Sequence, residues 1–226
     1  GLLQLPSLLL LGIPFPNALA THKVASVALG IGASIPHLKR QYIDKTFSLL
    51  ILISGIPGVL LGSYFASIVP TNFSTILLGL LTLSLSIYSF FNKKLGSSVN
   101  RQSINKSNLI IGSIGLFFIG FLNGYLSSGT GLFVTIWMIT IFNLSFSVAI
   151  AYTLIFVGIF WNGVGALSLG LSGNIIWNYL TVLILGSLVG GYLGARFSII
   201  KGSRFIKIIF EFISFSVGCS LLIKVF

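Results

Sequence analysis

The chain has 226 residues, of which 55% are hydrophobic and 7% are charged, and its mean hydropathy is +1.08. A soluble domain carries about 25% charged residues, so this composition indicates an integral membrane protein. The formal charge of +11 comes from cations in short breaks between apolar runs, and this distribution argues against a nucleic-acid partner. The two acidic residues, Asp44 and Glu211, are too few for a metal site or for carboxylate catalysis by an enzyme.

In chain order, the first apolar run, Leu2–Leu11, is too short to cross a bilayer, whose core of about 30 Å requires about 20 helical residues. Later runs reach that length, and the region Leu109–Phe142 is too long for one span. We therefore expect an all-α polytopic membrane protein with about seven to nine membrane-embedded helices. The predicted full spans are Ala18–Ile35, Thr46–Val69, Asn72–Phe91, Ser147–Leu169, Ile175–Phe197 and Phe205–Lys224.

Three polar residues lie together at the start of the first full span. Lys23 would supply a fixed positive charge for an anion, and His22, which follows Thr21, would supply a group that titrates near neutral pH. The alternative is an interfacial lysine that extends its ammonium group to water at a helix end. We take Thr21, His22 and Lys23 as candidate binding residues.

The long apolar region is interrupted at 127–131 by serine, threonine and glycine, which would make a poor continuous helix in lipid. We predict a longer arm, Leu109–Leu126, and a short helix, Leu132–Phe142. A helix that begins inside the membrane offers backbone N–H groups and a partial positive charge to an anion. The alternative is a packing kink whose hydroxyls bond back to the helix. The candidate residues of this break are Ser127, Ser128, Gly129, Thr130 and Gly131.

Two amide side chains lie next to the predicted breaks. Asn123 precedes the break at 127–131, and Gln4 lies in the short first run. A buried amide costs free energy unless it is hydrogen-bonded. We therefore predict that Asn123 and Gln4 face the pore and contribute to the binding site.

Three breaks are rich in lysine and arginine, namely 36–45, 92–108 and 197–204. The positive-inside rule places all three on the cytoplasmic side of the cell (inner) membrane. For them to share one side, the segment interrupted at 127–131 has to enter and leave on that side as a hairpin or re-entrant pair.

A weak internal repeat relates two parts of the chain. Ala18-Leu19-Ala20 matches Ala149-Ile150-Ala151 at an offset of 131, and the ladder that begins at Ser54 matches the one that begins at Gly186 at an offset of 132. The alternative is that apolar helices merely look alike. The predicted units are a first membrane repeat at 1–92, a basic cytoplasmic loop at 93–107 and a second membrane repeat at 108–226.

The predicted topology makes the two repeats inverted, which is typical of secondary transporters that rock two halves around a central site. The first repeat lacks a counterpart of Leu109–Leu126, so we expect a complete chain to begin with one more apolar helix and this chain to be truncated at its N-terminus. The small-residue ladders Ser54-Gly58-Gly62-Ala66 and Gly186-Gly190-Gly194-Ser198 are expected to bring helices close together.

These segments resemble the TauE/SafE sulfite exporter family. Pro16–Lys23 resembles its NALATNK-type segment, Gly120–Gly131 its signature G-F-x-D-G-x-x-G-x-G-T-G, and Gly190–Arg196, followed by Lys201-Gly202, its G-x-x-L-G-A-R...K-G segment. Gly1–Pro6 is similar to the end of its G-G-G-x-x-x-x-P motif, which fits the expected truncation. Two departures are Asn123, where close relatives have an acidic residue, and Tyr152-Thr153-Leu154, which lacks the lysine often found in the second repeat.

The resemblance implies export or uptake of a small oxyanion without ATP. We expect a secondary transporter of sulfite, a sulfonate or a related organic oxyanion that works by alternating access in a lipid bilayer, with no cofactor. The coupling ion is left open between a proton and sodium, and the assembly between a monomer and a homodimer. The alternative function is a non-transporting membrane subunit or scaffold that packs through its glycine ladders.

Overall fold

The computed structural model describes residues 3–38, 43–91, 105–201 and 203–225, and these residues form helices without strands. Six helical segments in this part of the chain are long and apolar enough to span a membrane, which confirms an all-α polytopic membrane protein. They are α2 (Phe15–Leu38), α3 (Lys45–Ile68), α4 (Thr71–Phe91), α5 (Lys106–Leu126), the segment that contains α7, η1 and α8, and α9 (Trp177–Lys201). The remaining helices are α1 (Gln4–Leu10), α6 (Thr130–Phe142) and α10 (Ser203–Val225).

The predicted span Ser147–Leu169 is a single helical segment with an irregular centre. It begins as α7 (Phe146–Tyr152), continues as the π-helix η1 (Thr153–Trp161) and ends as α8 (Asn162–Leu171). Trp161 at the end of the π-helix donates a hydrogen bond to the Ile51 carbonyl oxygen of α3 at 3.1 Å. The sequence did not predict the π-helix, a feature that often lies at functional sites.

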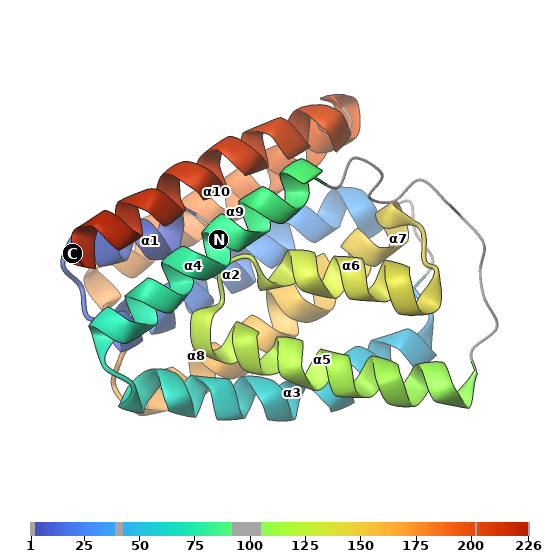
Figure 1. Cartoon of the computed structure of the whole chain (residues 1–226), viewed down its shortest axis with the longest axis horizontal. Coiled ribbons are helices and arrows are strands. Elements are labelled where there is room, and N and C mark those ends of the chain that lie inside the picture. Colours follow the sequence, from blue (N-terminus) through green and yellow to red (C-terminus); the bar gives the residue numbers. More distant parts are fainter. Residues whose placement is uncertain (1–2, 39–42, 92–104, 202, 226) are drawn as a thin grey trace.

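The helix directions bring the flanks of the predicted basic breaks to one end of the molecule (Figure 1). The end of α4 and the start of α5 lie at the right of the view, as do the end of α9 and the start of α10. α5 runs away from this end and the shorter α6 returns toward it, as the predicted hairpin requires. Residues 39–42, 92–104 and 202 of the three predicted basic breaks, and hence most of the predicted loop 93–107, lie outside the described residues.

The ladder of α3 packs directly against α5. A Cβ atom added at Gly58 would lie 2.1 Å from the Phe117 carbonyl oxygen, and one at Gly124 of α5 would lie 2.2 Å from the Val59 carbonyl oxygen. Such distances leave no room for a side chain between the two backbones, so only glycine fits at these positions. The structure confirms close packing for this ladder.

The matching ladder of α9 behaves differently. Gly191, rather than Gly190, faces α2, where an added Cβ would lie 2.6 Å from the Leu29 carbonyl oxygen. A Cβ at Gly186, Gly190 or Gly194 would meet no atom of the described chain within 4 Å. The prediction of close packing is therefore wrong for these three glycines within the described chain, because α9 turns a neighbouring face toward α2.

The helix order of the two predicted repeats is the same. α1, α2, α3 and α4 occur in the first part, and α6, the α7–η1–α8 segment, α9 and α10 occur in the second. α2 and the α7–η1–α8 segment run in opposite directions (Figure 1), which inverted topology requires. The division into repeats at 1–92 and 108–226 stays a prediction.

Candidate functional site

Lys23 lies deep inside the helical bundle. It follows the start of α2 by eight residues, about 12 Å along the helix axis, and it is fully buried. Its ammonium nitrogen donates to the backbone carbonyl oxygen of Asn123 at 2.8 Å and to the Asn123 side-chain oxygen at 3.2 Å. Lys23 is thus not an interfacial lysine in this structure, and it connects α2 to the C-terminal end of α5.

The break between α5 and α6 lies next to this lysine. α5 ends at Leu126, Ser127 and Gly129 have φ values of 59° and 78°, and α6 begins at Thr130, two residues earlier than predicted. The Asn123 amide nitrogen donates to the Thr130 hydroxyl at 2.9 Å. A continuous hydrogen-bonded path therefore runs from Lys23 through Asn123 to the first residue of α6.

The polar groups of the break bond to one another in this conformation. The Thr130 hydroxyl donates to the Ser127 carbonyl oxygen at 2.6 Å, and the Ser127 hydroxyl donates to the Asn162 side-chain oxygen at 3.4 Å. The backbone N–H of Leu132 donates to the Gly129 carbonyl oxygen at 3.0 Å. The Thr130 hydroxyl bonds back to the break, as the packing-kink alternative expects, whereas the Ser127 hydroxyl bonds to Asn162 of α8. An anion would have to replace some of these bonds.

Lys23 has no carboxylate partner among the described residues. Asp44 caps α3, where its side chain accepts from the Thr46 N–H at 2.8 Å, and Glu211 in α10 accepts from the Ser89 hydroxyl at 2.9 Å. Neither acid is among the hydrogen-bond partners of Lys23. A charged ammonium in the membrane interior is costly without a counter-ion, so the position of Lys23 favours a negatively charged ligand.

A glycine in α8 makes room for the lysine side chain. An added Cβ at Gly165 would lie 2.8 to 3.0 Å from the last three atoms of Lys23. A Cβ at Gly163, two residues earlier, would make only an ordinary contact of 3.9 Å with Val27. Gly165 therefore leaves the space that the end of the Lys23 side chain occupies.

Thr21 has a different role from Lys23. Its hydroxyl donates to the Asn17 carbonyl oxygen at 2.8 Å and accepts from the Ile176 N–H at 3.0 Å, just before α9 begins. Thr21 thus fastens α2 to the start of α9. The structure does not bring its hydroxyl into the Lys23 network.

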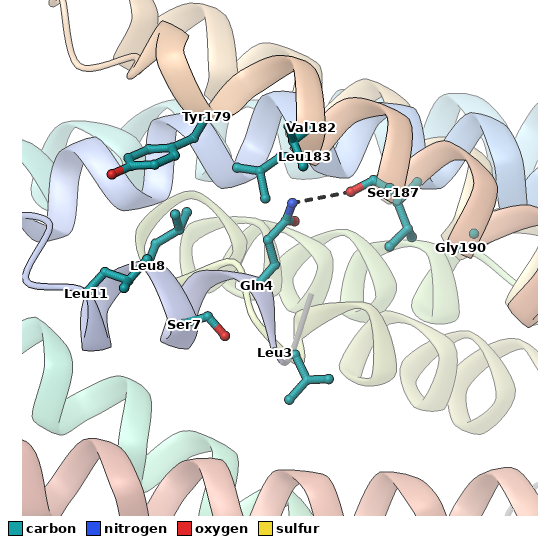
Figure 2. Close-up of a pocket in the computed structure, with 13 residues that line it drawn as sticks. Leu3, Gln4, Ser7, Leu8, Leu11, Tyr179, Val182, Leu183, Ser187 and Gly190 are labelled. Carbon is teal, nitrogen blue, oxygen red and sulfur yellow. Dashed lines mark hydrogen bonds between the residues drawn. The ribbon is translucent and has the colours of Figure 1, made fainter.

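His22 and Gln4 form a second polar cluster. The His22 ring contacts the Gln4 side-chain oxygen at 2.9 Å, and the Gln4 amide nitrogen donates to the Ser187 hydroxyl at 3.3 Å (Figure 2). Gln4 and Ser187 line a groove of about 450 Å³ between α1 and α9. Lys23 and His22 therefore belong to two separate networks, and Thr21 belongs to neither of them.

The structure adds residues that sequence reasoning did not assign to a site. Asn162 contacts Ser127 from α8, and its signal in the sequence is a single amide in an apolar span. Ser26 contacts the His22 ring, one helical turn away. Gly165 carries no sequence signal of its own, because its role depends on a lysine in another helix. No group of three metal-ligating side chains occurs among the described residues.

Comparisons with known proteins agree with this architecture. The chain is 28% identical over 216 residues to a probable membrane transporter protein of Haemophilus influenzae. The aligned region covers 95% of this chain and 83% of that protein. The chain is 25% identical over 224 residues to the probable membrane transporter protein YfcA of Escherichia coli K12, covering 98% of this chain and 81% of that protein. Among solved structures, none gives a significant match. The family model for the sulfite exporter TauE/SafE matches residues 1–221, and the chain therefore belongs to the TauE/SafE family of membrane transporters.

Proposed function

We propose that this protein is a secondary transporter that carries a small oxyanion, such as sulfite or a sulfonate, by alternating access across the cell (inner) membrane. The observation that carries the proposal is Lys23, a fully buried cation whose two hydrogen bonds go to the neutral residue Asn123. A permanent partner for a buried lysine is normally a carboxylate. Here the negative charge comes from the substrate.

The anion binds between Lys23 and the break that precedes α6. It takes the place of Asn123 at the ammonium group and adds the N-terminal dipole of α6, a helix of 13 residues. Because Asn123 also contacts Thr130, loss of the Lys23 bond loosens the break as the anion enters. Movement of one half of the bundle against the other then exposes the anion to each side, with the basic helix ends facing the cytoplasm.

The first test is flux in proteoliposomes loaded with labelled sulfite or a short labelled sulfonate. We expect saturable flux of at least one of these anions without ATP. We also expect it to stabilise the purified protein against heat, since ligand at 100 times its Kd contributes about 2.7 kcal/mol to the folded state. A folded protein with neither flux nor stabilisation by any small oxyanion would contradict the proposal.

A scaffold function is the second candidate. It is favoured by the open face of α9, where Gly186, Gly190 and Gly194 meet no atom of the described chain. Such a face suits a partner helix. A scaffold function does not explain why Lys23 is buried. If no small anion stabilises the protein against heat, however, the scaffold function becomes the better candidate.

A substitution in α8 tests whether the position of Lys23 matters. Gly165→Ala puts a methyl group against the end of the Lys23 side chain, which has to leave its preferred rotamer at a cost of about 0.5–1.5 kcal/mol. We expect anion affinity to fall about 2- to 10-fold, with little change in thermal stability. Affinity is read from the concentration dependence of flux.

Gly163→Ala is the matched control for this substitution. It adds the same methyl group to the same helix, but at an ordinary contact distance from Val27. We expect its anion affinity to equal that of the unmodified protein. Equal affinities in both variants would show that the ammonium position beside Gly165 does not set anion binding.

A further inference from the structure

His22 has a set of partners that suits a group which gains and loses a proton. The side chain is 1% exposed and belongs to α2. Its Nδ1 lies 2.9 Å from the Gln4 side-chain oxygen of α1, and its Nε2 lies 3.2 Å from the hydroxyl of Ser26, one turn further along α2. The Ser26 hydroxyl also lies 3.4 Å from Nδ1, so the shortest contact of each ring nitrogen is with a different polar group, the Gln4 oxygen for Nδ1 and the Ser26 hydroxyl for Nε2.

The hydrogen bonds assign the proton of the neutral ring. With the Gln4 amide in the orientation of this structure, its oxygen faces Nδ1 and can only accept, so Nδ1 carries the hydrogen and donates it. Nε2 is then the acceptor, and the Ser26 hydroxyl donates to it. When Nε2 takes up a proton, the hydroxyl rotates and accepts instead. The ring is therefore hydrogen-bonded in both protonation states without a change of the backbone. A histidine with a purely structural role does not need partners that suit both states.

A polar path leads from the ring to the groove. Gln4 bonds to His22 with its oxygen and to Ser187 of α9 with its nitrogen, and both Gln4 and Ser187 line the groove of about 450 Å³ (Figure 2). Tyr179 of α9 is the titratable residue that lines this groove, and α1, η1 and α8, which also pack against α2, carry no titratable side chain. The charged neighbour on the same helix is Lys23, next to His22 in the sequence.

We propose that His22 is the proton-binding site that couples anion movement to proton movement. This inference rests on the proposed anion site at Lys23. A proton on Nε2 places a second positive charge beside Lys23, which is unfavourable while the anion site is empty and favourable when an anion is bound. Proton and anion therefore bind together, and the proton taken from water on one side is released to water on the other. The protein would therefore carry the anion and the proton across the membrane in the same direction.

The test measures proton movement that accompanies an anion which carries no proton itself. Methanesulfonate stays fully ionised near neutral pH, whereas sulfite protonates and would move protons on its own. Proteoliposomes hold a pH indicator inside, and a potassium ionophore clamps the membrane potential. In the unmodified protein we expect inward methanesulfonate flux to acidify the interior. In His22→Asn we expect the number of protons moved per methanesulfonate anion to fall to background.

His37→Asn is the matched control, because His37 is the other histidine of the chain and lies in the last turns of α2. Its acidification should equal that of the unmodified protein. Ser26→Ala is a second variant, which keeps His22 but removes the hydroxyl that accepts from the protonated ring, and it should move fewer protons per anion. This variant decides the question if His22→Asn does not fold.

The outcomes separate the two proposals. No methanesulfonate or sulfite flux in the unmodified protein overturns the transport function itself. Methanesulfonate flux without acidification in the unmodified protein overturns only the coupling at His22. Full acidification in folded His22→Asn, or an unchanged proton-to-anion ratio in Ser26→Ala when His22→Asn does not fold, also overturns it.

Discussion

Replacing Lys23 by methionine is expected to abolish anion-dependent stabilisation and to lower anion flux by at least about 100-fold, since losing one partner of a buried ion pair costs about 3–5 kcal/mol. Methionine keeps the length and apolar stem of lysine but removes the charge. In the absence of substrate, Lys23 is a fully buried ammonium held by Asn123 alone. The melting temperature of the substrate-free variant should therefore equal or exceed that of the unmodified protein.

Lys106→Met is the control for this prediction. Lys106 is exposed and begins α5, so its loss changes the net charge of the protein by the same amount without touching the buried site. We expect its flux and its anion-dependent stabilisation to be unchanged. If Lys23→Met transports at the rate of Lys106→Met, then Lys23 does not bind the anion. The neutral break before α6 would then be the remaining candidate for the anion site.

Local chemistry predicted where the helices break. Serine and glycine between Leu126 and Thr130 cannot continue a helix in lipid at low cost, and the structure ends α5 and begins α6 there. α6 begins two residues before the predicted start because Gly129, at φ 78°, completes the turn and leaves Thr130 free to adopt helical angles. The positions where these helices end and begin can be predicted from the sequence because they depend only on residues that are neighbours in the chain.

The assignment of partners depends on the whole fold, and the sequence could not supply it. Lys23 and Asn123 are 100 residues apart, and their contact requires α2 to meet the end of α5. Thr21 and Lys23 are two positions apart in the sequence, which in an α-helix turns their side chains about 200° apart, onto nearly opposite faces. Their hydroxyl and ammonium groups therefore serve different contacts. The π-helix η1 likewise has no local composition that distinguishes it from a regular span.

A valine substitution should separate the two glycine ladders by their effect on stability. Gly58→Val places side-chain atoms where an added Cβ already lies 2.1 Å from the Phe117 carbonyl oxygen, so α3 and α5 have to move apart. Overpacking of this kind typically costs about 1–3 kcal/mol, and more where backbone rather than a flexible side chain is the obstacle. We expect a lower melting temperature in detergent and a smaller yield of monodisperse protein.

Gly190→Val is the matched change in α9, because its added Cβ meets no atom of the described chain within 4 Å. Valine also has a better helix propensity than glycine. The free energy of unfolding should therefore change by less than about 0.5 kcal/mol, and the melting temperature should stay the same or rise slightly. Destabilisation by Gly190→Val equal to that by Gly58→Val would mean that α9 packs through its ladder as α3 does. The open face of α9 would then be filled in the purified protein, and the two ladders that the sequence matches would have the same structural role.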